Sequence, residues 1–62
     1  MKVTLFVDDS IESHQAIERF RKVDVNLSVS YVSGYGLPSV KIGNTIYPGM
    51  WGVEFVLYGL EK

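Results

Sequence analysis

The fold is decided where an apolar strand runs into an amphipathic helix, in the stretch Val3-Thr4-Leu5-Phe6-Val7-Asp8-Asp9-Ser10-Ile11-Glu12-Ser13-His14-Gln15. Its first five residues are apolar or β-branched and uncharged, which predicts a strand buried on both faces. Asp9 and Glu12 have the spacing of a capping box, and Ser10 is the alternative cap. A turn of this kind also presents the free N–H groups of a helix N-terminus, which favour an anion.

The helix that follows is expected to run to about Lys22, because apolar and small side chains recur at helical spacing. The expected buried stripe is Ser13, Ala16, Ile17, Phe20 and Val23. Glu18 and Lys22 are spaced as an i,i+4 ion pair on the exposed side, which predicts a small stabilisation.

Three strands and a helix are expected in the rest of the chain, at residues 27–33, 39–42, 45–47 and 50–60. Residues 27–33 alternate apolar and polar side chains, and a strand, a helix and a strand in this order form a right-handed unit with parallel strands. Gly43-Asn44 is a two-residue hairpin turn between the next two strands. The chain is therefore predicted to be an α/β protein with a four-stranded mixed sheet and two helices.

Alternation in the later strands predicts two layers. Residues 27–33 and 39–42 each have one polar face, which a sheet covered by helices on both sides would not show. Both helices are therefore expected on one face, with Phe6 pointing to the open face. The last helix is apolar almost all round, so this 50–60 helix or the open sheet face is a candidate homodimer contact.

Length and composition limit the chain to one small domain, residues 1–62. The formal net charge is −1 and the basic residues do not cluster, which argues against nucleic acid or an anionic membrane as a partner. The chain has no cysteine, so it can form neither a disulfide nor a cysteine-based metal site. No signal or lipidation motif follows Met1, and no apolar run reaches the length of a membrane span. We therefore expect a cytoplasmic protein without a cofactor.

The ordered set of elements resembles the thioredoxin fold in its small glutaredoxin-like form. The matching stretches are Val3-Thr4-Leu5-Phe6-Val7, Ser10-Ile11-Glu12-Ser13-His14-Gln15-Ala16, Leu37-Pro38-Ser39-Val40-Lys41-Ile42-Gly43 and Ile46-Tyr47-Pro48-Gly49. Glutaredoxins commonly have Cys-Pro-Tyr-Cys at the helix start and Val-Pro-Thr-Val before a glycine turn. The resemblance places the two cysteine positions on Ser10 and Ser13, and the cis-proline position on Pro38.

The chain departs from the family pattern in two respects. Both motif cysteines are serine, with Ile11 and Glu12 between them. The second helix of the family, which lies between the second and third strands, is missing, and only Gly34-Tyr35-Gly36-Leu37 remains there. This loop has to cross the end of the central strand, a gap of roughly 10 Å that four or five extended residues span. The open sheet face expected from the alternation is the face that the missing helix would cover.

Serine at both motif positions has two explanations. In the family, the first cysteine attacks a disulfide as a thiolate and the second resolves the mixed disulfide, which a serine hydroxyl cannot do near neutral pH. The chain is either a natural relative without redox chemistry or a dithiol protein in which both cysteines were changed to serine. In both cases we expect Ser10 to serve as the N-cap and Ser13 to face the edge of the core.

The resemblance also implies a binding edge. In this fold the backbone of the residue before the cis-proline, here Leu37, pairs with an extended peptide or with glutathione. The implied binding residues are Ser10, Ile11, Glu12, Leu37 and Pro38, with Tyr35 and Trp51 as candidate walls. Asp8 and Asp9 would repel an anionic ligand, which counts against glutathione.

Two further classes stay open. His14, the only histidine, is i,i+4 from Ser10, so a Ser–His nucleophile pair is an alternative, although it has no evident orienting carboxylate. One histidine with Asp8, Asp9 and Glu12 gives no recognised ligand spacing, so no metal is expected. The function classes are therefore a redox-inert binding module, an enzyme built on Ser10 and His14, and a structural domain that dimerises.

Overall fold

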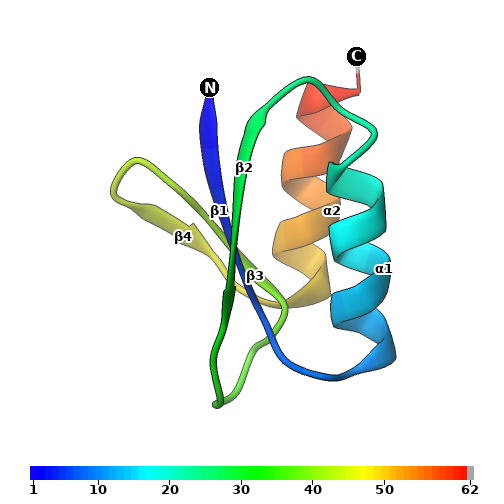
Figure 1. The fold of residues 1–62 in the computed structure, drawn as a ribbon. Coiled ribbons are helices and arrows are strands. Elements are labelled where there is room, and N and C mark those ends of the chain that lie inside the picture. Colours follow the sequence, from blue (N-terminus) through cyan, green and yellow to red (C-terminus); the bar gives the residue numbers. More distant parts are fainter. Residues whose placement is uncertain (62) are drawn as a thin grey trace.

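A computed structural model describes residues 1–61 and has the predicted order of four strands and two helices (Figure 1). The elements are β1 (Lys2–Val7), α1 (Ile11–Phe20), β2 (Asn26–Tyr31), β3 (Ser39–Ile42), β4 (Thr45–Tyr47) and α2 (Gly49–Leu60). The predicted bounds of β3 and β4 are confirmed. Two elements are shorter than predicted, because α1 ends at Phe20 and β2 ends at Tyr31.

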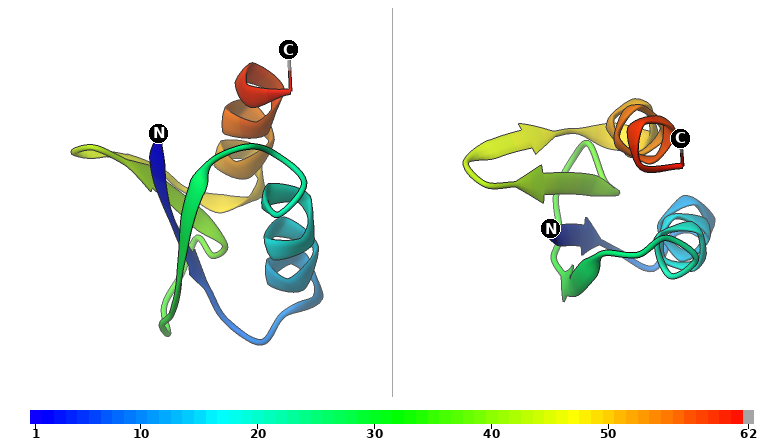
Figure 2. Two further views of the ribbon diagram at one scale, coloured as in Figure 1. Left: turned by 45° about the horizontal axis from the view of Figure 1, so that its top comes forward. Right: turned by 90° about the horizontal axis from the view of Figure 1, so that it is seen from above.

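The sheet has the strand order β2-β1-β3-β4 and is mixed. β1 pairs with β2 in parallel and with β3 antiparallel, and β4 pairs with β3 antiparallel. Figure 2 shows both helices on one side of the sheet, which confirms the two-layer prediction. Because β1 lies between β2 and β3, the loop from residue 32 to residue 38 crosses the end of β1, as the sequence predicts.

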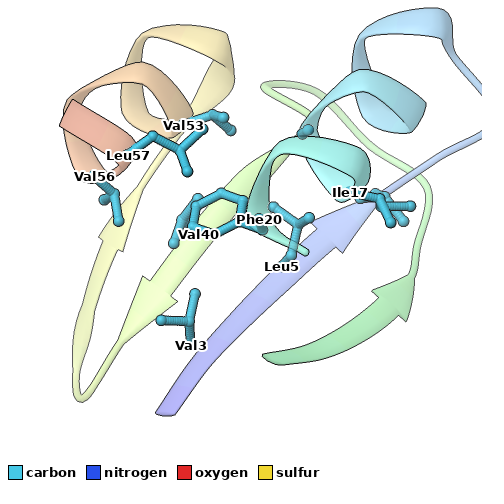
Figure 3. Close-up of a cluster of buried hydrophobic side chains, with 10 residues drawn as sticks. Val3, Leu5, Ile17, Phe20, Val40, Val53, Val56 and Leu57 are labelled. Atoms are coloured by element: carbon cyan, nitrogen blue, oxygen red, sulfur yellow. The ribbon is translucent and has the colours of Figure 1, made fainter. Parts of the chain in front are cut away.

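The core lies between this sheet and the helices (Figure 3). The residues that share full or nearly full burial there are Val3, Leu5, Val7, Ala16, Ile17, Phe20, Val40, Val53, Val56 and Leu57. On the opposite face of β1, Thr4 and Phe6 are only half-buried. The prediction that this strand is buried on both faces is therefore wrong, because both helices that the structure describes cover the other face. Phe6 lies on that open face, as expected.

Helix α1 uses the predicted stripe. Ser13, Ala16, Ile17 and Phe20 are its buried residues, while Val23 lies beyond the helix end and is partly buried against the core. The ion-pair prediction is wrong, because Glu18 pairs with Arg21 at 3.7 Å rather than with Lys22. The helix ends before Lys22, so the i,i+4 spacing does not hold there. Arg19 and Glu54 form a second ion pair, which joins the exposed sides of α1 and α2.

Helix α2 is apolar on its inner and outer sides. Its buried residues are Gly52, Val53, Val56 and Leu57, whereas Trp51, Phe55 and Tyr58 are more than half exposed. The rings of Trp51 and Phe55 stack with a centroid distance of 5.6 Å, and Phe55 also stacks on Tyr47 of β4 at 5.7 Å. In the part of the chain that the structure describes, neither helix is long and apolar enough to cross a membrane.

Candidate functional site

Ser10 caps helix α1. Its backbone is extended, with φ −72° and ψ 160°, and its Oγ accepts a hydrogen bond of 3.1 Å from the Ser13 N–H. This confirms the alternative cap and makes the Asp9–Glu12 capping box wrong. With Asp9 as the cap, Ser10 would have to be helical, and its ψ excludes that.

Asp8 and Ser13 close the turn before the helix. The Ser13 hydroxyl donates to Asp8 Oδ1 at 2.8 Å and accepts from the Asp8 N–H at 3.1 Å. Asp8 Oδ1 also accepts from the Ser10 N–H at 3.0 Å. We call these three bonds the Asp8–Ser13 clasp. Ser13 is completely buried, so its hydroxyl is satisfied inside the protein and is not presented to a substrate.

The polar groups around the Asp8 side chain favour its ionised carboxylate. The Ser10 hydroxyl contributes most, followed by the Ser10 N–H and the Ser13 hydroxyl, and together they lower the pKa of Asp8 below its ordinary value of 3.8. Hydrogen bonds to a carboxylate stabilise the charged form relative to the protonated form. The helix start therefore holds a fixed negative charge at neutral pH, at the point where a helix N-terminus favours one.

Pro38 lies at the same end of the sheet as this turn. Phe6 of β1 is paired with Ser39 of β3, and one step further along the two strands Pro38 comes beside Val7. Pro38 is completely buried, Leu37 is half-buried, and the Leu37–Pro38 peptide bond is cis. The structure therefore brings the Ser10 turn and the Leu37–Pro38 segment to one end of the sheet.

The start of helix α2 is tied to the same region. The Gly49 N–H donates to the Gly36 carbonyl at 2.8 Å, which connects the crossing loop to the first residue of α2. Gly36 has φ +73° and Gly49 has φ +71°, a backbone conformation that favours glycine. This bond fixes the loop that carries Leu37 relative to both layers.

The remaining predicted binding residues differ in how they are presented. Ile11 is 73% exposed and Glu12 is also exposed, so both are available on the surface beside Ser10. Tyr35 is fully exposed at the tip of the crossing loop. Trp51 stacks on Phe55 along the outer side of α2, so the structure gives it a partner within its own helix.

The Ser10–His14 pair is not formed as a catalytic pair. The His14 backbone N–H donates to the Ser10 carbonyl at 3.2 Å, which is an ordinary helical bond, and the ring lies on the exposed side of α1. Among residues 1–61, no hydrogen bond joins the Ser10 hydroxyl to the His14 ring. The same residues contain no group of three or more acidic or histidine side chains placed to hold a metal ion.

Sequence reasoning missed the role of Asp8, which it treated as a strand terminator and a source of repulsion. The signal was present in the spacing Asp8-Asp9-Ser10, because an aspartate often accepts from the backbone N–H two residues later. The partner Ser13, five residues away, has no such local signature. The stacked rings of Trp51 and Phe55 were also missed, although their i,i+4 spacing places them on one helix face.

Comparisons with family models, with curated proteins and with solved structures found no match to this chain.

Proposed function

We propose that the chain is a glutaredoxin-like module of the thioredoxin fold that has no redox chemistry and binds an extended segment of a partner protein. The observation that carries the proposal is the position of two serines, three residues apart, at the start of α1 and at the same sheet end as Leu37–Pro38. A sheet order of β2-β1-β3-β4 with both helices on one face is compatible with a minimal form of that fold.

Binding at this end rests on the backbone of Leu37. The family resemblance implies that the residue before this proline offers its carbonyl and its N–H to an extended peptide, as in β-strand addition. Ile11 adds an exposed apolar side chain next to this backbone, and Glu12 adds an exposed charge. Asp8 and Glu12 make the edge acidic, so the proposed partner segment is neutral or basic rather than anionic.

The test restores the missing thiols with Ser10→Cys and Ser13→Cys in one chain. In the restored reaction, the thiolate at position 10 attacks one sulfur of a substrate disulfide and expels the other substrate sulfur as a thiolate. The thiolate at position 13 then attacks the sulfur at position 10 and releases the second substrate thiol. The substrate gains two electrons and two protons, and the domain ends with a disulfide.

A substitution of Asp8 adds a second test, because a carboxylate near the cysteine at position 10 would disfavour its thiolate form. We therefore expect Asp8→Asn, added to the two cysteine substitutions, to raise the rate of insulin disulfide reduction further at neutral pH. The Ser10→Cys variant alone should form a mixed disulfide that is not released. The parent chain and Asp8→Asn without cysteine are the inactive controls. A folded double-cysteine variant with no disulfide exchange would count decisively against the proposal.

Two alternatives have their own readouts. Cysteine codons at positions 10 and 13 of the natural coding sequence would identify the chain as an altered dithiol oxidoreductase. Labelling of Ser10 by a fluorophosphonate probe would establish the serine-enzyme alternative, which the hydrogen bond from the Ser13 N–H to Ser10 Oγ does not favour.

A further inference from the structure

Strand β2 forms one edge of the sheet, and its outer side is unpaired. Figure 2 shows no other element beyond it, and within residues 1–61 its only sheet partner is β1. It is six residues long and contains no proline. The opposite edge strand, β4, has three residues and is followed directly by Pro48. Short strands and prolines are devices that prevent edge pairing, and β2 has neither.

Alternate residues of β2 point their backbone N–H and carbonyl groups away from the sheet. The Asn26 N–H donates to the Met1 carbonyl at 2.9 Å and the Val32 N–H donates to the Val7 carbonyl at 2.9 Å. Even-numbered residues of β2 therefore point their backbone groups toward β1. Since these directions alternate along a strand, Leu27, Val29 and Tyr31 point their N–H and carbonyl groups away from the sheet.

The side chains of β2 are symmetrical about Val29. The sequence Leu27-Ser28-Val29-Ser30-Tyr31 reads apolar, serine, valine, serine, apolar in both directions. The three apolar residues lie opposite the buried residues Val3, Leu5 and Val7 of β1, so they share the helix-covered face. Val29 is nevertheless 37% exposed and Tyr31 63% exposed, because they are at the edge.

Charge does not oppose contact between two copies of this edge. Asp24 and Lys41 are the nearest charged residues before and after β2, and no side chain between them is charged. A partner of opposite charge would gain nothing here, whereas an identical uncharged edge meets no like-charge repulsion. A two-fold symmetric contact needs a surface that complements itself, and this strand has that property.

We propose that a second copy of the chain pairs with β2 in antiparallel orientation, with the two-fold axis at Val29, so that the two sheets become continuous. In this register Val29 faces Val29 of the second copy, Leu27 faces Tyr31, and Ser28 faces Ser30. All three residues with outward backbone groups then oppose one another, and each such pair exchanges two hydrogen bonds. Registers displaced by two residues leave some of these groups unpaired.

The groove between α2 and strands β3 and β4 is a less specific surface for a second copy. Ile42, Tyr47, Phe55 and Tyr58 line this open groove, which has a volume of about 540 Å³. Its aromatic side chains suit many apolar partners. Nothing in this groove selects an occupant or a register, whereas the edge of β2 specifies both.

The test introduces a positive or a negative charge at Val29, the residue that should face the same residue of the second copy. Analytical ultracentrifugation of the whole chain up to about 1 mM should show a reversible dimer, because a contact made by one short strand is weak. Val29→Lys and Val29→Glu should each weaken the dimer about fivefold or more, since they place like charges opposite each other. An equal mixture of the two variants should restore association, because lysine then faces glutamate. Trp51→Lys, on the outer side of α2, is the matched control and should leave the dimer unchanged.

A measurement on the parent chain does not depend on the folding of any variant. In a mixed sample of labelled and unlabelled protein, an intermolecular NOE should connect the Ser28 Hα and the Ser30 Hα, which approach closely in a non-hydrogen-bonded antiparallel pair. A chain that stays monomeric at about 1 mM overturns the proposal. It is equally overturned if Trp51→Lys dissociates the dimer while Val29→Lys does not, or if the mixed Val29 variants fail to associate.

Discussion

The same substitution at two glycines of α2 is expected to have opposite effects on stability. A Cβ atom added at Gly52 would lie 2.3 Å from the carbonyl oxygen and 2.4 Å from the carbonyl carbon of Tyr47. A Cβ atom added at Gly59 would meet nothing within 4 Å. Gly52 is buried and Gly59 is exposed, and neither has a positive φ that would itself require glycine.

The magnitudes follow from helix propensity and from overpacking. Gly59→Ala should stabilise the fold by about 0.5 to 1 kcal/mol, because alanine loses less conformational entropy in a helix. Gly52→Ala has the same gain, but its new methyl group meets backbone atoms of β4 that cannot rotate away. Overpacking of this kind costs about 1 to 3 kcal/mol or more, so the net change should be a loss of about 2 kcal/mol. A domain of this length has only about 3 to 9 kcal/mol of stability in total.

Thermal unfolding followed by circular dichroism measures both changes. With a shift of about 4 to 8 °C per kcal/mol, Gly59→Ala should raise the Tm by roughly 4 °C and Gly52→Ala should lower it by roughly 10 °C. Urea titration should give the same signs with little change in the m-value. A rise in Tm for Gly52→Ala would contradict this expectation, because it would mean that α2 does not approach β4 as closely as the structure has it.

Two further predictions concern the start of α1. Ser10→Ala removes the oxygen that accepts from the Ser13 N–H, so it should destabilise the protein by about 1 kcal/mol in urea titration, and Ser10→Asp, a good cap, should recover most of the loss. An unchanged urea midpoint for Ser10→Ala would argue against the cap. The lowered pKa of Asp8 makes its contribution to stability fully present above the ordinary pKa of 3.8 and lost as the pH falls through the lower folded value. Stability of the parent should therefore fall as the pH drops below about 4, and Asp8→Asn should flatten that part of the profile; parallel profiles would assign the pH dependence to other carboxylates.

The sequence was sufficient for the order of elements and for the two layers. Alternation in residues 27–33 and 39–42 correctly located the open face, because a side chain on an uncovered face has no reason to be apolar. The same logic failed for the first strand, where Thr4 and Phe6 are β-branched or aromatic without being buried. Their residue types suit a strand in either environment, so composition alone did not distinguish them.

Site residues were predicted correctly where their role depends on the next few residues of the sequence. They were missed where their role depends on a contact that the fold creates. Ser10 was identified as a possible cap because capping depends on the next three residues. The choice between Asp9 and Ser10 needed the backbone angle of Ser10, which the sequence does not contain. The bonds between Asp8 and Ser13 depend on how the strand enters the helix, and the contact of Gly52 with Tyr47 depends on the distance between a helix and a strand. Neither follows from residue spacing.

The Asp8–Ser13 clasp also determines how the domain responds to its surroundings. A domain whose helix start is closed by a disulfide changes in stability when that bond is reduced. Here the same turn is closed by hydroxyl, amide and carboxylate groups, none of which gains or loses electrons under cellular conditions. The geometry of the turn therefore does not depend on the redox potential of the surroundings. Its contribution to the stability of the domain is the same in a reducing and in an oxidising compartment.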